Sequence, residues 1–345
     1  MKTLSLQPPA HHAPPCCVLI GRGILENIPK LITEAEGIIV LHDARVEKIA
    51  KNVSALLGNA PCLSVASGEA SKSMSEAERI CAQLLKMKMS RRSVLITIGG
   101  GMLTDLGGFV ASIYQRGIRV IHVPTTLLAM TDAAVGGKTA VDLGSAKNMI
   151  GTIHQPLGIV MDIATLEGLP QTAISEGMVE AVKMAAILDA ESFEWMEKHT
   201  KDILKREDAA LIETIERSVR MKAAVIEEDE RESGKRMLLN FGHTVGHAVE
   251  ALSNFSIPHG QAVSIGMVCE MMMAGTKGAD RVTALLQSME MPTDIPKEFT
   301  TEDLWDLMQS DKKSSGGVVR MAVPDRIGHG AVQAISKDLF ARSRS

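Results

Sequence analysis

Apolar positions in the first half of the chain follow two alternating patterns. Short runs rich in β-branched residues predict strands at 37–41, 62–65, 94–98, 120–123 and 159–163. Between the first three runs, apolar residues at helical spacing predict helices at 46–57 and 75–87. Strands that alternate with helices are typical of a parallel sheet covered by helices, so a Rossmann-like α/β domain is predicted here.

The pattern changes after about residue 165, where helical spacing replaces the alternation. Helices are predicted at 174–188, 209–226, 237–252, 262–274 and 281–289. Gly168 and Pro170 interrupt the chain where the pattern changes. We therefore expect an α/β domain at 1–167 and an all-α domain at 168–345.

The overall charge and composition argue against a nucleic-acid partner. The chain has 345 residues, with 37 basic and 41 acidic side chains and a net charge of −4. No overall basic field is therefore available to attract a polynucleotide, and an aromatic content of 3% leaves few side chains on which bases can stack. Local basic groups can still bind a small anionic substrate.

The cysteines and the N-terminal residues bear on location. Five cysteines are an odd number without paired metal-ligand spacing, which favours reduced thiols and a cytoplasmic protein. Residues 1–17 contain four prolines and lack the apolar stretch of a signal peptide, and no run of eighteen apolar residues predicts a membrane span. His11, His12, Cys16 and Cys17 suggest either a small metal cluster or, more simply, a proline-interrupted terminus without stable structure.

Three consecutive glycines, Gly99, Gly100 and Gly101, follow the predicted strand 94–98 and open a helix that extends to Tyr114. Glycines let backbone amides approach a phosphate, and a helix N-terminus adds partial positive charge. The spacing differs from the Gly-x-Gly-x-x-Gly motif of dinucleotide-binding proteins, so a plain tight turn explains it equally well.

Further polar loops favour a nucleotide site. The run 123–126 leads to a loop at 136–139, in which the neighbours of Lys138 are too small to bury it. Lys147 follows soon after, and 67–72 forms another polar loop behind a predicted strand. Loops that follow successive parallel strands meet at one edge of the sheet, where nucleotides usually bind.

Two charged residues occupy a predicted helix that is otherwise apolar. Glu180 and Lys183 are the only charges between Gly177 and Leu188. A Glu and a Lys three residues apart are ordinarily a modest surface pair, but these apolar neighbours imply burial, and buried charges need partners.

Three histidines suggest that one such partner is a metal ion. His243 and His247 lie four residues apart on one helical face, where they can bind one metal or be core histidines satisfied by hydrogen bonds. His259 favours the metal, because it precedes another uncharged helix and can project into a cavity. One carboxylate and two imidazoles form the open three-ligand site of catalytic zinc, which leaves the third histidine for acid-base chemistry.

In their order and spacing, these residues closely resemble the 3-dehydroquinate synthase family. The matching motifs are Gly99-Gly100-Gly101 through Asp105, Tyr114-Gln115-Arg116-Gly117, Val123-Pro124-Thr125-Thr126-Leu127-Leu128, Asp132 through Gly136-Gly137-Lys138-Thr139, Lys147-Asn148, Glu180-Ala181-Val182-Lys183, Leu238-Leu239-Asn240-Phe241-Gly242-His243-Thr244-Val245-Gly246-His247 and Pro258-His259-Gly260. The resemblance extends from about Asp43 to 311–313. The chain departs from the family pattern at Arg45, Ser145, Ala146, Met184 and Gln261, none of which matches a metal ligand or a proton-transfer residue.

The resemblance implies an N-terminal NAD-binding domain and a helical C-terminal domain that binds a metal and the substrate. It implies catalytic NAD, a divalent metal that is usually zinc, with cobalt as an alternative, and a homodimer. The implied reaction converts 3-deoxy-D-arabino-heptulosonate 7-phosphate, a small anionic sugar phosphate, into 3-dehydroquinate and phosphate. This lyase reaction belongs to the shikimate pathway, which leads to chorismate and the aromatic amino acids.

The resemblance also implies a role for individual residues. Glu180, His243 and His259 match the metal ligands, and His247 matches a histidine that moves protons. The positions that match NAD contacts are Asp43, Gly68, Glu69, Lys72, Gly100, Gly101, Met102, Leu103, Thr104, Asp105, Thr125, Thr126, Lys138, Lys147, Thr165, Leu166, Glu167 and Gly168. The positions that match substrate contacts are Asp132, Lys138, Asn148, Lys183, Lys222, Arg236, Asn240 and either Lys312 or Lys313. Arg116 matches an arginine that reaches a phosphate in the partner subunit.

Three other functions are compatible with part of this pattern. A sibling sugar-phosphate cyclase, of the inosose or valiolone synthase type, acts on a substrate without a carboxylate, whereas Lys222, Arg236 and Asn240 suit a substrate with one. A metal-dependent polyol dehydrogenase of the glycerol dehydrogenase type shares the two-domain plan and accumulates NADH. An inactive binding protein could keep the fold, but the metal and proton-transfer positions are intact.

Overall fold

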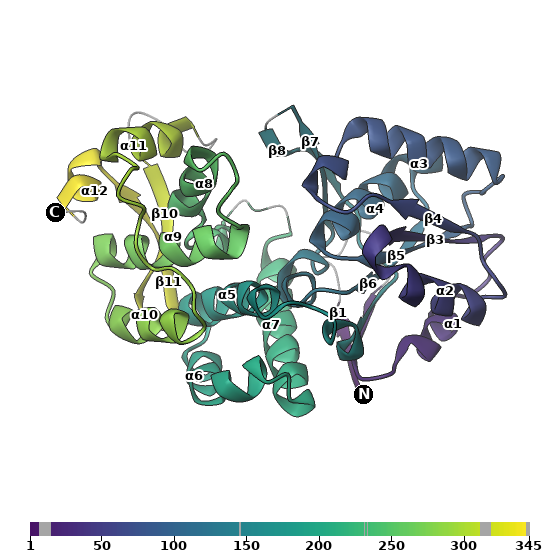
Figure 1. The fold of residues 1–345 in the computed structure, drawn as a ribbon, viewed down its shortest axis with the longest axis horizontal. Helices are drawn as coiled ribbons and strands as arrows, with labels where there is room; N and C mark the ends of the chain where they lie inside the picture. The colour runs from purple at the N-terminus through teal and green to yellow at the C-terminus, as the bar shows by residue number, and fades with distance from the viewer. Residues whose placement is uncertain (7–14, 145, 231, 233, 311–318, 343–345) are drawn as a thin grey trace. The chain divides into compact units, whose positions relative to one another are not determined.

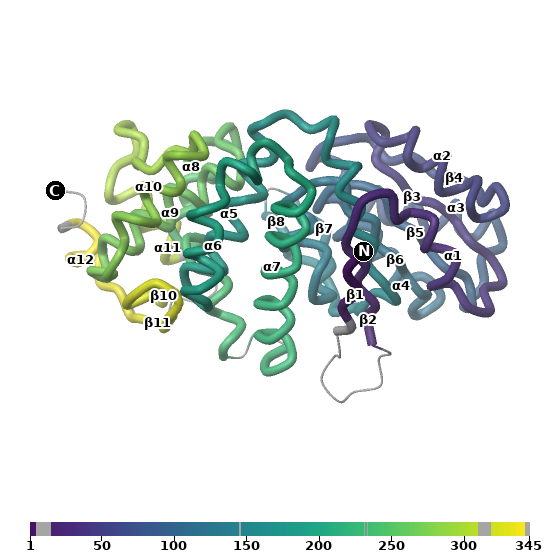
Figure 2. Tube along the Cα trace, turned by 90° about the horizontal axis from the view of Figure 1, so that it is seen from below, coloured from purple at the N-terminus to yellow at the C-terminus, as the bar shows by residue number. Residues whose placement is uncertain are grey.

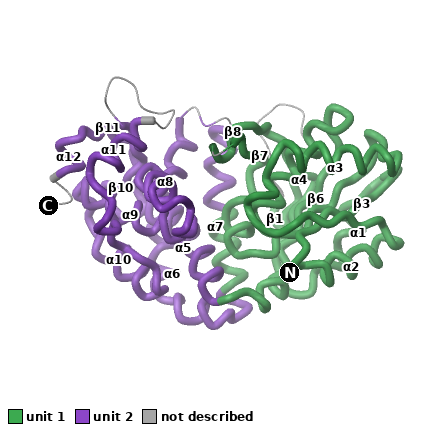
Figure 3. The backbone as a smooth tube through the Cα atoms, turned by 45° about the horizontal axis from the view of Figure 1, so that its top comes forward, with its two compact units in different colours: residues 1–170, 211–219 green, residues 171–210, 220–345 purple. Residues whose placement is uncertain are grey.

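The computed structural model describes residues 1–6, 15–144, 146–230, 232, 234–310 and 319–342. It divides into two compact units, coloured separately in Figure 3. Unit 1 contains Met1–Pro170 and Leu211–Val219, and unit 2 contains Gln171–Ala210 and Arg220–Ser345. The predicted division into an NAD-binding domain at 1–167 and a metal- and substrate-binding domain at 168–345 stays a prediction.

A seven-stranded sheet forms the centre of unit 1 (Figure 1). Its strands, in spatial order, are β1 (Lys2–Leu6), β2 (Cys16–Gly21), β9 (Gly158–Asp162), β6 (Arg119–Pro124), β5 (Val94–Gly99), β3 (Ile38–Asp43) and β4 (Cys62–Val65). All neighbours pair in parallel except β1 and β2. Strands β3 and β5 are neighbours although β4 separates them in sequence, so the strand order reverses there, as in Rossmann-like sheets. The predicted α/β fold is confirmed.

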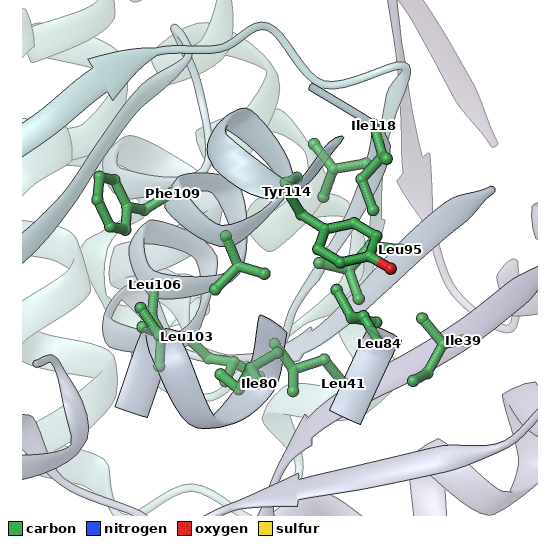
Figure 4. Packing of buried hydrophobic residues seen from close by; sticks show 14 of the residues in the cluster. Ile39, Leu41, Ile80, Leu84, Leu95, Leu103, Leu106, Phe109, Tyr114 and Ile118 are labelled. Atoms are coloured by element: carbon green, nitrogen blue, oxygen red, sulfur yellow. The ribbon is translucent and has the colours of Figure 1, made fainter. Parts of the chain in front are cut away.

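Helices cover both faces of this sheet. They are α1 (Ile28–Leu31), α2 (Glu47–Leu56), α3 (Met74–Lys86) and α4 (Gly101–Ile113). Alternate residues of a strand point to opposite faces. Accordingly, Ile39 and Leu41 pack in the core under α3 and α4, drawn in Figure 4, whereas Val40 packs in the core under α1 and α2.

Shorter turns connect these elements. They are η1 (Leu25–Asn27), η2 (Ala44–Val46), η3 (Glu69–Ser71), η4 (Tyr114–Arg116), η6 (Ile163–Leu166) and a π-helical turn, η5 (Ala129–Ala133). Two glycines let α4 approach its neighbours closely. A Cβ on Gly107 would lie 2.3 Å from Thr97 Cγ2 of β5, and a Cβ on Gly108 would lie 2.7 Å from Thr139 Cγ2.

The predicted loop at 136–139 is partly a strand, which corrects the sequence analysis. Lys138 and Thr139 begin β7 (Lys138–Leu143), which pairs antiparallel with β8 (Ala146–Ile153). The glycines at 136 and 137 mask this strand in the sequence pattern, but they only bend the chain into it, with φ of 97° and 67°.

The expectation that the N-terminal 17 residues lack stable structure is wrong for the described part. Lys2–Leu6 and Cys16–Gly21 form strands that run side by side (Figure 2), and Cys16 is buried. Lys2 also binds two carboxylates of α7 (Asp208–Glu228), with its Nζ 2.8 Å from Glu213 Oε2 and close to Glu216 Oε2. His11 and His12 lie outside the described residues.

Unit 2 is mainly helical, as predicted. Its elements besides α7 are α5 (Gln171–Leu188), α6 (Ala190–Leu204), η7 (Lys235–Asn240), α8 (His243–Leu252), α9 (His259–Ala274), α10 (Ala279–Ser288), α11 (Thr301–Ser310), α12 (Lys337–Arg342), β10 (Val319–Arg326) and β11 (His329–Ile335). The β10–β11 hairpin was not predicted. It contributes buried residues such as Met321 and Val323 to the core formed by α8, α9 and α11. None of the helices in the described ranges is both long and apolar enough to cross a membrane.

The single helix predicted at 237–252 is two elements, which is a second correction. η7 ends at Asn240 and α8 begins at His243, because Gly242 between them adopts the left-handed conformation with φ of 77°. Glu270 of α9 holds this break. Its buried carboxylate accepts hydrogen bonds from Gly242 N at 2.7 Å and from Val245 N at 3.0 Å.

A buried histidine in β6 should make unit 1 sensitive to acid. His122 shares a 2.7 Å hydrogen bond with Thr97 Oγ1, and burial lowers its pKa to about 3. The unfolded chain therefore takes up this proton first, and stability is lost as the pH falls from about 6.5 toward 3. We expect unit 1 to lose about 2 kcal/mol between pH 7 and pH 5 through His122. Urea unfolding at both pH values measures this loss, and it should disappear in His122→Asn; an equal loss in both proteins would contradict it.

Candidate functional site

Most of the NAD positions implied by the resemblance follow the carboxyl ends of parallel strands in unit 1. Asp43 ends β3, 68–72 follows β4, 100–105 follows β5, 125–126 follows β6, and 165–168 follows β9. Because these strands are parallel, all five segments begin at one edge of the sheet. This edge is where an open α/β sheet binds a nucleotide.

Strands β3 and β5 end side by side at the point where the strand order reverses. A Cβ on Gly99 would lie 3.3 Å from the Asp43 side chain, and Gly99 O accepts a 2.8 Å hydrogen bond from Thr125 N. Gly100 then caps α4, whose first turn presents backbone N–H groups. A glycine-bordered helix N-terminus of this kind suits a pyrophosphate.

Lys72 joins three of the predicted segments. Its side chain is only 5% exposed and lies 2.7 Å from Asp105 Oδ2 and 3.6 Å from Glu69 Oε1, and it binds Asn148 Oδ1 of β8. Burial opposes the charge, but the neighbouring carboxylates outweigh it and raise the pKa of Lys72 above its ordinary value. Lys72 therefore carries its charge at neutral pH and ties the β7–β8 hairpin to α4.

Asp162 positions the segment that follows β9. Its buried carboxylate accepts hydrogen bonds from Gly23 N and Ile24 N at 2.9 Å and from Ala164 N at 3.0 Å. Thr165 Oγ1 donates a 2.8 Å hydrogen bond to the Asp162 carbonyl oxygen, and Glu167 pairs with Arg22. Thr165, Leu166, Glu167 and Gly168 therefore belong to a rigidly held turn.

The other predicted positions of unit 1 are dispersed. Arg116 is exposed on a tight turn in which Gln115, Arg116 and Gly117 all have positive φ, at 52°, 62° and 115°. Asp132 lies in η5, Lys138 begins β7 and is exposed, and Lys147 is half-buried on β8. Lys72 brings Asn148 together with Asp105, whereas Arg116 lies apart from these contacts.

Four titratable side chains of unit 2 converge from three helices. Glu180 comes from α5, His243 and His247 from α8, and His259 from the first position of α9. Glu180 Oε1 lies 3.4 Å from His259 Nε2 and 3.8 Å from His243 Nε2. The His243 ring centroid is 5.2 Å from that of His247 and also from that of His259.

Glu180, His243 and His259 fit a divalent metal ion. Their ligand atoms all lie within 4.8 Å of one another. Two ligands each about 2.1 Å from a tetrahedral ion are about 3.4 Å apart, close to the separations observed. Both Glu180 oxygens are buried without a hydrogen bond of regular geometry, and Lys183 Nζ lies 2.5 Å from Oε2. Oε1 thus faces the imidazoles while Oε2 faces the ammonium group.

The electrostatics of this cluster favour an added cation. Burial opposes charge on Glu180, but Lys183 and the histidines hold its pKa well below the usual range. Burial and the Lys183 ammonium lower the pKa of His243, which keeps this imidazole neutral, as a metal ligand must be. Burial also lowers the pKa of His259, but Glu180 and Glu250 outweigh it and raise it to about 10.

His247 is the most exposed member of the cluster. It belongs to a second possible ligand set with Glu250 and His259. The two sets share His259. The first set contains no exposed residue, whereas the second contains the exposed His247. The structure therefore brings together all four residues that the sequence analysis placed here, and the division of roles among the histidines stays a prediction.

The substrate positions of unit 2 are mostly buried. Lys183, Lys222 and Arg236 are 2%, 7% and 2% exposed, which is unusual for such long charged side chains. Asn240 Nδ2 donates a 2.5 Å hydrogen bond to Glu232 Oε1, and Arg236 Nη1 binds the Glu230 carbonyl oxygen. Lys312 and Lys313 lie outside the described residues.

Sequence reasoning missed four buried carboxylates that position this machinery: Asp162, Asp229, Glu250 and Glu270. Asp229 Oδ2 accepts hydrogen bonds from Gly234 N at 2.7 Å and Arg236 N at 3.0 Å. Two of the four had a visible signal. Glu250 and Glu270 are isolated charges in otherwise apolar helices, which is the argument that identified Glu180.

Comparisons with known proteins agree with this arrangement. A family model described as 3-dehydroquinate synthase N-terminal matches residues 62–176, and one described as 3-dehydroquinate synthase C-terminal matches 177–314. The 3-dehydroquinate synthase of Symbiobacterium thermophilum is 37% identical over 327 residues, covering 90% of this chain and 91% of the relative. That of Saccharolobus solfataricus is 38% identical over 327 residues, covering 91% and 92%.

A solved structure of a related cyclase has the same fold. It is 2-deoxy-scyllo-inosose synthase complexed with carbaglucose-6-phosphate, NAD+ and Co2+. The match has a TM-score of 0.90 and 25% sequence identity, and it covers 99% of both chains.

Proposed function

The chain belongs to the 3-dehydroquinate synthase family, and we propose that it converts 3-deoxy-D-arabino-heptulosonate 7-phosphate into 3-dehydroquinate and phosphate. This phosphate-eliminating lyase reaction places the enzyme in the shikimate pathway. The observation that carries the proposal is the convergence of Glu180 Oε1 with one nitrogen each of His243 and His259, in a chain at least 37% identical to two synthases.

Two bound groups supply the reactivity that side chains lack. When bound, NAD supplies reversible hydride transfer, and a divalent metal supplies polarisation of a substrate oxygen. We propose that Glu180, His243 and His259 hold the metal, that it is zinc because one carboxylate and two imidazoles suit zinc, and that cobalt can replace it. The NAD positions are those at the carboxyl edge of the sheet, with the α4 N-terminus facing the pyrophosphate.

The remaining residues bind, orient and move protons. Asp229 holds the backbone N–H of Arg236 and the Glu230 carbonyl oxygen holds its Nη1, so the guanidinium is positioned to bind the substrate carboxylate. Lys183, Lys222, Asn240, Asp132, Lys138 and Asn148 are the other substrate contacts that we propose. His247 lies beside the proposed ligand His243 and is exposed. We propose that one of its ring nitrogens takes up a proton and returns it during the reaction.

An assembly and a cytoplasmic location complete the proposal. We propose a homodimer in which Arg116 reaches a phosphate bound by the partner subunit, since an exposed arginine on a tight turn suits such a role. All five cysteines are free, which agrees with the reducing environment of the cytoplasm.

A coupled assay tests the function. Purified protein is incubated with the heptulosonate phosphate, with and without added NAD, while phosphate and NADH absorbance are followed. We expect phosphate release that depends on catalytic NAD and leaves no lasting NADH, because the hydride is returned in each cycle. Lasting NADH without phosphate would instead indicate a polyol dehydrogenase.

The same assay separates the synthase from a sibling cyclase. Glucose 6-phosphate carries a phosphate but no carboxylate, and the inosose synthase with the same fold binds a carba analogue of it. We expect no phosphate release from glucose 6-phosphate, because Arg236 and Lys222 would have no carboxylate to bind. Release from glucose 6-phosphate alone would overturn the proposed substrate.

A further inference from the structure

A carboxylate that lies outside the proposed ligand set contacts His259 from the opposite side. Glu250 Oε2 lies 3.3 Å from His259 Nδ1, while His259 Nε2 lies 3.4 Å from Glu180 Oε1. The imidazole of His259 is therefore held between two carboxylates, each facing a different ring nitrogen.

Glu250 is buried, so its carboxylate needs the hydrogen bond to His259. Its side chain is only 4% exposed on the third turn of α8, seven residues after His243. A buried carboxylate is retained only when it has partners, and an imidazole N–H is a strong one. The side chain of His259 is 36% exposed, against 1% for Glu180 and 13% for His243, so it is the least confined of the three proposed ligands and has more need of a second anchor.

We propose that Glu250 is a positioning residue for His259. Its carboxylate accepts the Nδ1–H, which selects the tautomer with the lone pair on Nε2 and fixes the ring plane toward Glu180. Metal-binding histidines are commonly oriented in this way, and loss of the orienting group typically weakens metal binding by about 10–100-fold. This inference rests on the proposed metal site of Glu180, His243 and His259.

The alternative role for Glu250 is that of a direct ligand. Glu250, His247 and His259 are close enough to hold an ion of their own. The two roles predict different coordination. A positioning carboxylate leaves the ligands around the ion unchanged when it is replaced, whereas a ligand does not.

Cobalt binding to the full-length, metal-depleted protein distinguishes these roles. Co²⁺ affinity is measured by competition with a chromophoric chelator, and the visible spectrum of bound Co²⁺ reports its ligands. We expect Glu250→Ala to weaken Co²⁺ binding by about 10–100-fold with an unchanged spectrum at saturation. Glu250→Gln, which keeps an oxygen acceptor, should recover part of this loss. Glu197→Gln, which removes a carboxylate that pairs with Arg281 instead, is the control and should bind Co²⁺ like the wild type.

A double-variant cycle ties the effect to His259. In a His259→Ala background, Glu250→Ala should cause no further loss of affinity, because there is no imidazole left to orient. Full additivity, or wild-type affinity in Glu250→Ala, would overturn the inference, and an altered spectrum would make Glu250 a ligand. Failure of the wild-type protein to bind Co²⁺ would instead overturn the metal site on which the inference rests.

Discussion

His243→Ala is expected to lose bound metal and activity together. His243 Nε2 is one of three ligand atoms that converge, and its ring is only 13% exposed at the first position of α8. Two remaining ligands hold a divalent ion poorly. Because polarisation of a substrate oxygen by a metal contributes several kcal/mol, we expect turnover to fall by at least about a thousandfold. Metal content by mass spectrometry and phosphate release measure the two losses.

His247→Ala is the matched comparison on the same helix, one turn later. We expect it to retain the metal, because Glu180, His243 and His259 stay in place, while turnover falls by about 10²–10⁴-fold through loss of a proton-transfer group. Circular dichroism should show that both variants are folded. Equal loss of metal in the two variants would contradict the proposed division of roles.

Gly266→Ala is expected to have the largest effect on stability. A Cβ at Gly266 of α9 would lie 1.9 Å from Gly242 O and 2.8 Å from Gly246 N, both of which are backbone atoms. No side chain can move aside to relieve this overlap, so α8 must shift with His243 on it. We expect unit 2 to lose at least about 3 kcal/mol of its free energy of unfolding, with reduced metal content.

Two other glycines provide graded controls for this substitution. A Cβ on Gly246 would lie 3.1 Å from Ala262 O, which predicts a smaller loss. A Cβ on Gly168 would meet no atom within 4 Å, which predicts almost none. Urea unfolding of the three alanine variants should rank them in this order. A Gly266→Ala protein as stable as the wild type would show that α8 and α9 do not pack as described.

The sequence predicted elements well where one periodicity continued through a whole segment. The strand at 62–65 and the helices at 262–274 and 281–289 correspond to β4, α9 and α10. Helix α9 is buried on almost every side, so the length of its nearly uncharged run predicted it rather than one apolar face. Prediction failed where glycine or proline interrupted the pattern. Gly136 and Gly137 concealed β7, and the prolines of residues 1–17 concealed β1 and β2.

The candidate metal site was predicted more fully than its supports. Glu180, His243 and His259 are separated by up to 79 positions in the sequence, but each stands out as an isolated polar residue in apolar surroundings. Glu250 and Glu270 also stand out as isolated charges in apolar helices, but the groups that they bind do not. Glu270 acts through hydrogen bonds to the backbone of a left-handed break, and such a partner depends on how α8 and α9 pack, which no local pattern encodes.

Helix α7 has a consequence for any attempt to dissect this protein. Its segment Leu211–Val219 belongs to unit 1, whereas the residues before and after it belong to unit 2. That segment carries Glu213 and Glu216, the partners of Lys2 at the edge of the unit 1 sheet. A gene fragment that stops at Pro170 would therefore encode unit 1 without one of its own pieces. We expect such a fragment to fold poorly on its own, and to fold better when a second polypeptide that begins at Gln171 supplies the missing segment.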